Sequence, residues 1–459
     1  MPPFFLPVDA IVFWSLTLAA LSVCVGAVCV RYRDEGLYSS AFVFCLGAFV
    51  YFFSVPLERF VRGQVEDVLH GEYFQVAAPG FVYFKIAAIG IAGVIAFALS
   101  LWATGFKTHM PDSRAPLTQT GGTRLFELAL MLFWAGLVAI MLIFFYDFIR
   151  HVSLSYEASY STQYNSPLPT LIMQIICLLN SILAVILAMR RKILPIIIAG
   201  LLFLVNFYLA FLLKEKSPGV IALLGMGYLY FYWVRFKSVA LMGALAGVIL
   251  ALFVLKPLYN ILNEHNPTEE HQTVMSHLLH INSRFTFTNL DSSGPMLVSA
   301  HILKEDAAPS YGRDLLQSMS IFVPRFIWSD RPLDASEAFA KKMIPTWEPG
   351  IGLGYSPVIE GFVNFGFWFS WVEFVLFGLV WGYMWRGFMR LFSGYGAPAH
   401  LDVIYRIAGY YVLILFFRGM LAGVMKQTLM YMIPFAVALA GMQFLAWLWQ
   451  RFHHRQMVA

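Results

Sequence analysis

Hydrophobic positions along this chain fall in runs of about twenty residues, separated by short polar connections. A helix needs about 20 mostly apolar residues to cross a bilayer, because its backbone polar groups cannot stay unpaired in hydrocarbon. The runs therefore predict an all-α, polytopic membrane protein with about eleven transmembrane helices. The predicted spans cover residues 8–30, 36–56, 80–104, 125–147, 169–189, 193–213, 218–235, 238–256, 361–386, 404–424 and 427–449.

One polar stretch is much longer than the other connections. Residues 257–360 separate eight predicted spans in residues 1–256 from three spans and a polar tail in residues 361–459. We predict one large loop with short amphipathic helices, one of them over residues 313–322, where Pro324 would stop it. Such helices, with aromatic side chains beside basic ones, are also typical of a cap that rests on the bilayer.

Composition agrees with this class of protein. Hydrophobic residues make up 59% of the chain and charged residues 12%. In soluble domains about 45–50% of the residues are hydrophobic and about 25% are charged. All four cysteines lie within apolar runs, so the large loop has no disulfide framework and no cysteine ligands for a metal. We therefore predict neither a metal site nor a cofactor, and no nucleic-acid surface.

Lysine and arginine in the short connections predict the orientation, because they concentrate on the cytoplasmic side. The connections on one side of the membrane are richer in them than those on the other. This bias predicts a periplasmic N-terminus, a cytoplasmic C-terminus and a periplasmic loop in the inner membrane of a bacterium. The basic residues of the predicted cytoplasmic side are Arg31, Arg33, Lys107, Arg114, Arg124, Arg190, Arg191, Lys192, Arg235, Lys237, Arg386, Arg390, Arg406, Arg451 and Arg455.

Several segments of the loop resemble one family. The run Tyr311-Gly312-Arg313-Asp314 is followed by Val323-Pro324-Arg325-Phe326-Ile327-Trp328-Ser329-Asp330-Arg331-Pro332. Further on come Gly352-Leu353-Gly354-Tyr355-Ser356-Pro357 and Glu360-Gly361-Phe362-Val363-Asn364-Phe365-Gly366, with Asn282-Ser283-Arg284 upstream and Arg418 downstream. In this order and spacing the segments are similar to those of bacterial repeat-unit polymerases for O-antigen or exopolysaccharide (the Wzy type), which are related to O-antigen ligases.

That resemblance implies a GT-C-like membrane glycosyltransferase. Such an enzyme transfers a growing glycan from polyprenyl pyrophosphate to a new lipid-linked repeat unit on the periplasmic face, and polyprenyl pyrophosphate leaves. It implies lipid-linked oligosaccharides as substrates, and a chain-length regulator and a flippase as partners. Where relatives carry an arginine in a Gly-Ser-Arg-like run, this chain has Lys214 and Lys216 instead, which are substitute candidates. The other matched side chains implied to contact substrate are Tyr311, Trp328, Arg331, Tyr355 and Asn364.

Arginine suits this chemistry because its planar fork binds phosphate oxygens in a bidentate way and stays charged. Preorganised cations stabilise the negative charge that develops on a pyrophosphate leaving group. A cation inside an apolar run is costly, so Arg418 should face a cavity or a partner, and a salt bridge to Glu373 is its structural alternative. For Arg313 and Arg325 the alternative is contact with lipid headgroups. The pyrophosphate-binding candidates are Arg284, Arg313, Arg325, Arg331 and Arg418.

A general base must accept the proton of the acceptor hydroxyl. Glu360, where the loop meets the next predicted helix, is one candidate, although a carboxylate also stabilises the start of a helix without any catalytic role. His280 and Asp291 lie on either side of Arg284 and are alternative bases. Asn180 and Asn206, within predicted spans, are expected to join neighbouring helices.

Two other functions fit the same pattern less well. A ligase that moves finished glycan to a lipid core or a protein needs the same pyrophosphate site. A flippase or other transporter usually has internal repeats and broken helices, and the sequence shows neither. A polymerase therefore remains the leading expectation.

Overall fold

The structure is a computed structural model, and it describes most of the chain. The residues described are 8–36, 38–54, 67–70, 75–78, 80–108, 121–152, 167–212, 217–233, 293–305, 308–323, 327–328, 330–345, 352–393, 398–417 and 419–458. Seven predicted site residues and the predicted span 238–256 lie outside the described residues. The seven are Lys214, Lys216, His280, Arg284, Asp291, Arg325 and Arg418.

The first half of the described chain is helical apart from one short hairpin. The strands β1 (Asp67–His70) and β2 (Gln75–Ala78) pair antiparallel, with Asp67 opposite Ala78, so the chain is not strictly all-α. Most helix bounds lie within a few residues of the predicted spans. The helices are α1 (Val8–Glu35), α2 (Ser40–Ala48), η1 (Phe49–Phe53), α4 (Gly80–Ala103), α5 (Gly121–Phe144), α6 (Tyr146–Val152), α8 (Pro167–Ala188), α9 (Ile193–Leu212) and α10 (Ser217–Trp233).

The second half begins with short helices and ends with long ones. As predicted, a helix begins at Arg313 and the helical segment ends at Phe322, just before Pro324. The elements are α13 (Ser293–Glu305), α14 (Arg313–Ser318), η3 (Met319–Phe322), α15 (Ala335–Met343), α16 (Pro357–Phe369), α17 (Val372–Ser393), α18 (Pro398–Ile404), η4 (Tyr405–Gly409), α19 (Tyr410–Phe416) and α20 (Leu421–Val458).

The described part of the chain includes six helices that are long and apolar enough to cross a membrane. Their surfaces fit a lipid environment, since Ile193 and Leu204 of α9 are among many large apolar side chains left exposed. The protein is therefore a helical membrane protein. The six spans are Phe81–Ala103, Arg124–Phe144, Leu168–Ala188, Ile193–Ala210, Ala399–Phe416 and Leu421–Ala438.

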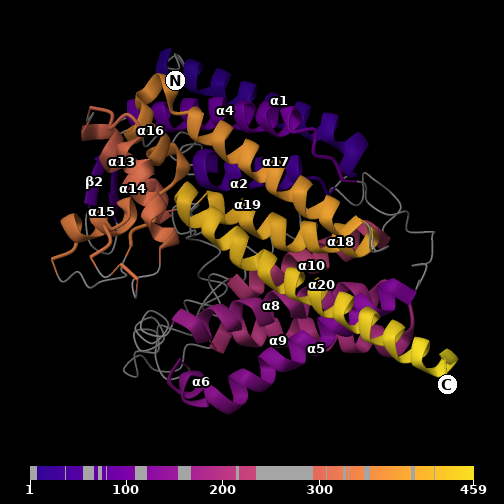
Figure 1. The fold of residues 1–459 in the computed structure, drawn as a ribbon. Coiled ribbons are helices and arrows are strands. Elements are labelled where there is room, and N and C mark those ends of the chain that lie inside the picture. The colour runs from indigo at the N-terminus through magenta and orange to yellow at the C-terminus, as the bar shows by residue number, and fades with distance from the viewer. Residues whose placement is uncertain are drawn as a thin grey trace, which may run out of the picture.

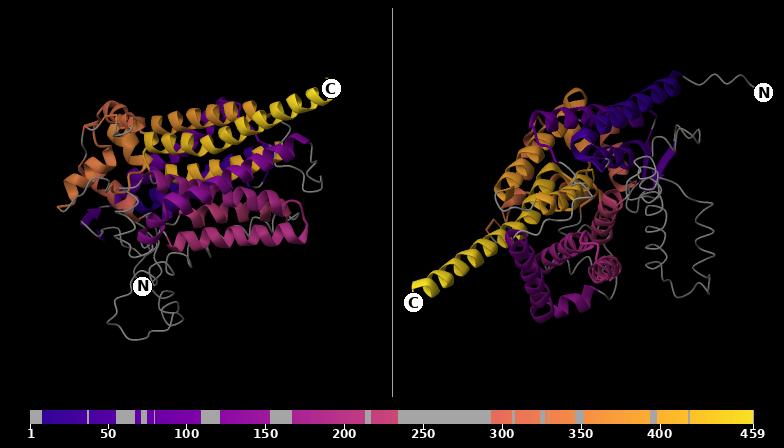
Figure 2. Two further views of the ribbon diagram at one scale, coloured as in Figure 1. Left: turned by 60° about the horizontal axis from the view of Figure 1, so that its bottom comes forward. Right: turned by 90° about the vertical axis from the view of Figure 1, so that its right-hand side faces the viewer.

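The long helices lie side by side in a bundle (Figure 1). At one end, which we call the loop end, α13, α14, α15 and α16 gather beside β2; the C-terminus of α20 lies at the opposite end, which we call the tail end. Figure 2 shows the same arrangement from two other sides. Helices α5, α8 and α9 form one group of the bundle, and α20 contacts α5.

Two predicted spans are interrupted at the loop end. In place of one helix over 361–386, α16 ends at Phe369 and α17 begins at Val372. Gly366 has φ 75° and ψ 176°, a conformation that glycine adopts readily and that a helix does not contain. A Cβ atom at Gly361 would lie 2.3 Å from the carbonyl oxygen of Ser370, so the chain folds back on itself there. We call residues 360–373 the elbow.

The second interruption lies between α19 and α20. The predicted span 404–424 is not continuous, because α19 ends at Phe416 and α20 begins at Leu421. The predicted site residue Arg418 falls between these two helices in the sequence and lies outside the described residues. Its neighbours Phe417 and Gly419 belong to the connection between the two helices.

A core of stacked aromatic side chains packs near the two helix interruptions. Phe44 of α2 stacks on Phe97 of α4 with ring centroids 3.7 Å apart. Phe377 of α17 stacks on Phe416, the last residue of α19, at 3.8 Å. Stacked aromatic pairs combine a large buried apolar area with a preferred geometry. The core therefore fixes the end of α19 relative to the first turns of α17.

Candidate functional site

The side chain of Asn364 joins two of the segments that carry the family resemblance. Its Oδ1 accepts hydrogen bonds from the backbone N–H of Leu315 at 3.0 Å and from Ser310 Oγ at 3.1 Å, and its Nδ2 donates to the carbonyl of Glu360 at 2.9 Å. The N–H of Gly312 also donates to the Asn364 carbonyl at 3.2 Å. Asn364 is buried, and its amide groups are engaged with the protein itself.

The start of α14 has an unusual backbone. Tyr311 has φ 51° and Gly312 has φ 85°, and a bulky residue adopts the left-handed region only rarely. The Tyr311 side chain is 85% exposed. Trp328 is also exposed at the loop end. Both aromatic candidates are therefore open to a ligand or to lipid headgroups, whereas Tyr355 is buried.

Glu360 lies in the first turn of α16, after Pro357, as predicted. Its Oε2 accepts a hydrogen bond of 2.7 Å from the backbone N–H of Leu421, the first residue of α20. An anion at a helix N-terminus is stabilised by N–H groups that have no partner within the helix and by the helix dipole. The carboxyl group of Glu360 therefore connects the elbow to the start of α20.

A second carboxyl group meets the first. Glu373, in the first turn of α17, is fully buried, and its carboxyl group lies close enough to that of Glu360 for the two groups to interact. Oε1 of Glu360 and both carboxyl oxygens of Glu373 have no hydrogen-bond donor among the residues that the structure describes. We call Glu360 and Glu373 the carboxyl pair.

The surroundings of the carboxyl pair add negative charge. Asp314 and Asp334 are close enough to affect Glu360 electrostatically, and burial, together with these charges, raises the pKa of the Glu360 carboxyl above its ordinary value. Tyr355 lies beside the pair, and burial raises the pKa of its hydroxyl. Tyr355 therefore stays neutral over the physiological range.

Two cations lie near Asp334. Arg331 Nη1 donates to the carbonyls of Ile321 and Val323 at 3.2 and 3.1 Å. Lys426 of α20 is half-buried and close enough to Arg331 and Asp334 for their charges to interact. In the part of the chain that the structure describes, neither cation forms an ion pair with a carboxylate. We call Arg331 and Lys426 the cation pair.

Of the predicted site residues, the structure brings Glu360, Asn364 and Tyr355 together, places Arg331 near Lys426, and leaves Arg313 and Tyr311 at the exposed edge. The sequence did not assign a site role to Lys426 or Glu373. Each is a charged residue within or beside an apolar run, which is the signal that marks functional positions in membrane proteins.

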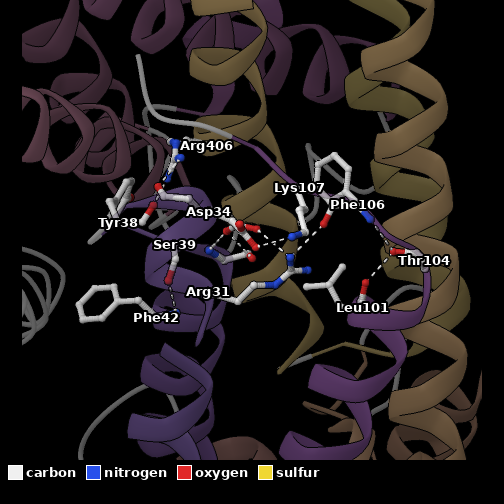
Figure 3. Close-up of polar contacts among 12 residues, drawn as sticks. Arg31, Asp34, Tyr38, Ser39, Phe42, Leu101, Thr104, Phe106, Lys107 and Arg406 are labelled. Atoms are coloured by element: carbon white, nitrogen blue, oxygen red, sulfur yellow. Dashed lines mark hydrogen bonds and ion pairs between the residues drawn. The ribbon is translucent and has the colours of Figure 1, made fainter. Parts of the chain in front are cut away.

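A different group of buried charges lies at the tail end (Figure 3). Arg406 Nε donates to both carboxyl oxygens of Asp402 at 2.9 Å, Nη2 donates to the carbonyl of Glu35 at 2.6 Å, and Nη1 donates to the carbonyl of Tyr38. Nη1 also reaches the hydroxyl of Tyr410 at 3.1 Å. Each guanidinium nitrogen of Arg406 therefore has an acceptor.

The two asparagines within spans act as predicted. Nδ2 of Asn180 donates to Oδ1 of Asn206 at 2.9 Å, and Nδ2 of Asn206 donates to the carbonyl of Cys177 at 2.7 Å. These bonds join α8 to α9. Among the described residues, no group of three or more His, Cys, Asp or Glu side chains is arranged to hold a metal ion.

Comparisons with known proteins do not identify a family. No protein-family model, no curated protein and no solved structure matches the chain significantly. The family resemblance of the loop segments therefore remains an expectation from the sequence. The carboxyl pair and the cation pair are the structural features that bear on function.

Proposed function

We propose that this protein polymerises lipid-linked glycan repeat units. It takes a growing glycan on polyprenyl pyrophosphate, transfers it to the sugar of a new polyprenyl-pyrophosphate-linked unit, and releases polyprenyl pyrophosphate. The observation that carries the proposal is the presence of both a carboxyl pair and a cation pair at the loop end of a membrane-embedded bundle. Asp334 interacts electrostatically with Glu360 and with Lys426, which supports placing both pairs in one site.

The two pairs suit the two halves of the reaction. Transfer to a sugar hydroxyl requires a group that accepts a proton, and Glu360 has a carboxyl oxygen without a donor among the described residues. Departure of the lipid requires positive charge near the pyrophosphate. Lys426 and Arg331 supply two charges that no carboxylate of the described residues neutralises by an ion pair.

The proposed location is the bacterial inner membrane, with the loop end at the periplasmic face. The N-terminus would then be periplasmic and the C-terminus cytoplasmic. Basic residues of the tail end support this orientation, because Arg31, Lys107 and Arg406 lie there together. A flippase would deliver the repeat unit, and a chain-length regulator would set the number of units.

The proposal is tested with the purified full-length protein in liposomes. Polyprenyl-pyrophosphate-linked repeat units are added alone, and the products are separated by size on a gel. A polymerase makes a ladder of lipid-linked glycans and releases polyprenyl pyrophosphate in proportion. The Lys342→Ala variant should keep the activity of the wild type, because Lys342 is an exposed lysine of the same loop.

Two results would contradict the proposal. If polymerisation failed and glycan moved intact to an added lipid core, the protein would be a ligase. If the lipid-linked unit crossed the bilayer without any change in its length, the protein would be a transporter. Deletion of the gene gives the matching cellular readout, since loss of a polymerase leaves surface glycan of a single repeat unit.

A further inference from the structure

The carboxyl pair contains three buried oxygens that accept hydrogen bonds and have no donor. Oε1 of Glu360 and both oxygens of Glu373 have none among the residues that the structure describes, although the two carboxyl groups contact each other. A buried acceptor without a partner costs about 1–3 kcal/mol, and more when it is charged. The pair as two carboxylates is therefore incomplete, and it needs one more positive centre between its oxygens.

The groups that face the pair do not supply that positive charge. Tyr355 is neutral, and Asp314 and Asp334 add negative charge. On the neighbouring helices, the ammonium group of Lys85 lies 5.9 Å from the ring centroid of Phe362, and Lys426 faces Arg331 and Asp334. Two adjacent carboxyl groups in such surroundings are expected to share one proton, because like charges cannot both persist there.

The surroundings of the carboxyl pair also determine which of its two carboxyl groups loses a proton first. Glu360 accepts the backbone N–H of Leu421 at 2.7 Å, at the N-terminus of α20. That contact favours a negative charge on Glu360. Glu373 has no comparable donor among the described residues. The shared proton therefore belongs on Glu373, where it forms a hydrogen bond to Glu360.

We infer that Glu373 is a positioning residue that holds one proton and donates it as a hydrogen bond to Glu360, and that Glu360 is the ionised carboxylate that accepts the proton of the acceptor sugar hydroxyl. This inference rests on the proposed polymerase function. In the step itself, the hydroxyl oxygen of the acceptor forms a bond to the anomeric carbon of the donor glycan. The bond from that carbon to the pyrophosphate oxygen breaks, and its electron pair leaves with the pyrophosphate. The hydroxyl proton moves to Glu360, which later releases it to water.

The role of Glu373 makes a specific prediction about substitution. Glutamine at position 373 keeps an N–H donor toward Glu360 but has no proton to lose. Glu373→Gln should therefore retain polymerisation within about tenfold of the wild type, whereas Glu360→Gln should lose about 10²–10⁴-fold. Glu373→Ala removes the donor and should fall between the two.

The pH profile separates this role from a purely structural one. In the wild type, rising pH removes the proton from Glu373 and places two negative charges side by side, so the rate should fall at alkaline pH. Glu373→Gln cannot ionise and should lack that alkaline fall. An active Glu373→Gln enzyme with the wild-type alkaline limb, or a variant as inactive as Glu360→Gln, would overturn the inference.

A second measurement does not depend on activity. The infrared spectrum of the full-length protein should contain the carbonyl stretch of a protonated carboxylic acid, and the difference spectrum between wild type and Glu373→Gln should isolate it. If that band is present and the wild type makes no polymer, the proposed function fails while the proton assignment stands. If the wild type polymerises without the band, or if chelator abolishes turnover and a divalent ion restores it, the inference fails and a cation joins the two carboxylates.

Discussion

At the tail end of the bundle, the guanidinium of Arg406 is enclosed by acceptors on every nitrogen, including both carboxyl oxygens of Asp402. At the loop end, Glu360 and Glu373 are buried just as deeply, yet three of their four carboxyl oxygens have no donor among the described residues. Buried charge is costly at both ends. Around Arg406 the protein itself offsets that cost, whereas at the carboxyl pair three acceptor oxygens are left without a donor among the described residues.

This difference distinguishes a buried charge with a structural role from one with a functional role. Arg406 joins the turn between α1 and α2 to η4, and its partners are two backbone carbonyls, the Asp402 carboxylate and the Tyr410 hydroxyl. The carboxyl pair joins the elbow to α20 through one backbone N–H only. Completed hydrogen bonding indicates a structural role, and incomplete hydrogen bonding indicates a functional one.

The largest expected effect is on stability at the tail end. Arg406→Ala leaves Asp402 as a buried carboxylate without its cation and removes the donors to Tyr38 and Glu35. Breaking a buried pair in this way costs about 3–5 kcal/mol. Thermal unfolding in detergent, followed by size-exclusion chromatography, should show a strongly lowered midpoint or no folded protein. The control is Lys107→Ala, since the ion pair of Lys107 with Asp34 is half-exposed and worth less than about 1 kcal/mol; equal effects of the two changes would refute the comparison.

The matching change at the loop end should affect activity and spare the fold. Glu360→Gln keeps an oxygen that accepts the Leu421 N–H, so the unfolding midpoint should stay near that of the wild type. The polymerisation rate should fall by about 10²–10⁴-fold, because the amide cannot accept a proton. Parallel measurements of glycan length and thermal midpoint on one preparation check both halves. A folded, fully active variant would remove Glu360 from the mechanism.

The cation pair should show a smaller effect on the same reaction. Lys426→Ala and Arg331→Ala each remove one positive charge near the leaving group, and each should cost about 10²–10³ in rate. Arg331→Lys should recover only part of the activity, because lysine keeps the charge but loses the planar fork. The initial rate of polyprenyl pyrophosphate release is the measurement. Lys342→Ala is the control, and a comparable loss in that variant would mean that general surface charge is responsible.

Asn364 tests whether the loop end is held together by hydrogen bonds within the protein. Asn364→Ala removes the bonds to Leu315, Ser310 and Glu360. We expect a loss of about 1–3 kcal/mol in stability, because buried partners are left unsatisfied. Proteolysis at the start of α14 should quicken in proportion. If stability is unchanged and only substrate affinity falls, the amide contacts substrate, as the family resemblance implies.

The smallest expected effect concerns topology and should leave activity and stability unaffected. Leu316→Cys introduces a thiol at a position that is 75% exposed at the loop end. An impermeant maleimide should label it in intact cells, and a cysteine added at the C-terminus should react only after the membrane is opened. The reverse labelling pattern would place the carboxyl pair and the cation pair on the cytoplasmic side, which the proposed reaction does not allow.

The class of protein and most of its helices can be predicted from the amino-acid sequence. Apolar runs predict α4 and α8 to within a few residues, because transfer into hydrocarbon depends on local composition. Local chemistry also located the start of α16 beside Glu360 and the end of the helical segment before Pro324. These features depend on residues that are close together in the sequence, so they can be predicted from a single sequence.

The assembly of the site, in contrast, depends on how distant segments pack. Hydropathy cannot distinguish one span over 361–386 from two helices that fold back, because the residues of the elbow are equally apolar in both arrangements. The reversal at Gly366 brings Glu373 to Glu360, and the break after Phe416 brings the N–H of Leu421 to the same carboxyl group. The same break sets where α20 begins, and the charge of Lys426 on that helix interacts with the charge of Arg331. Such contacts depend on how distant helices pack, and that packing is a property of the whole bundle.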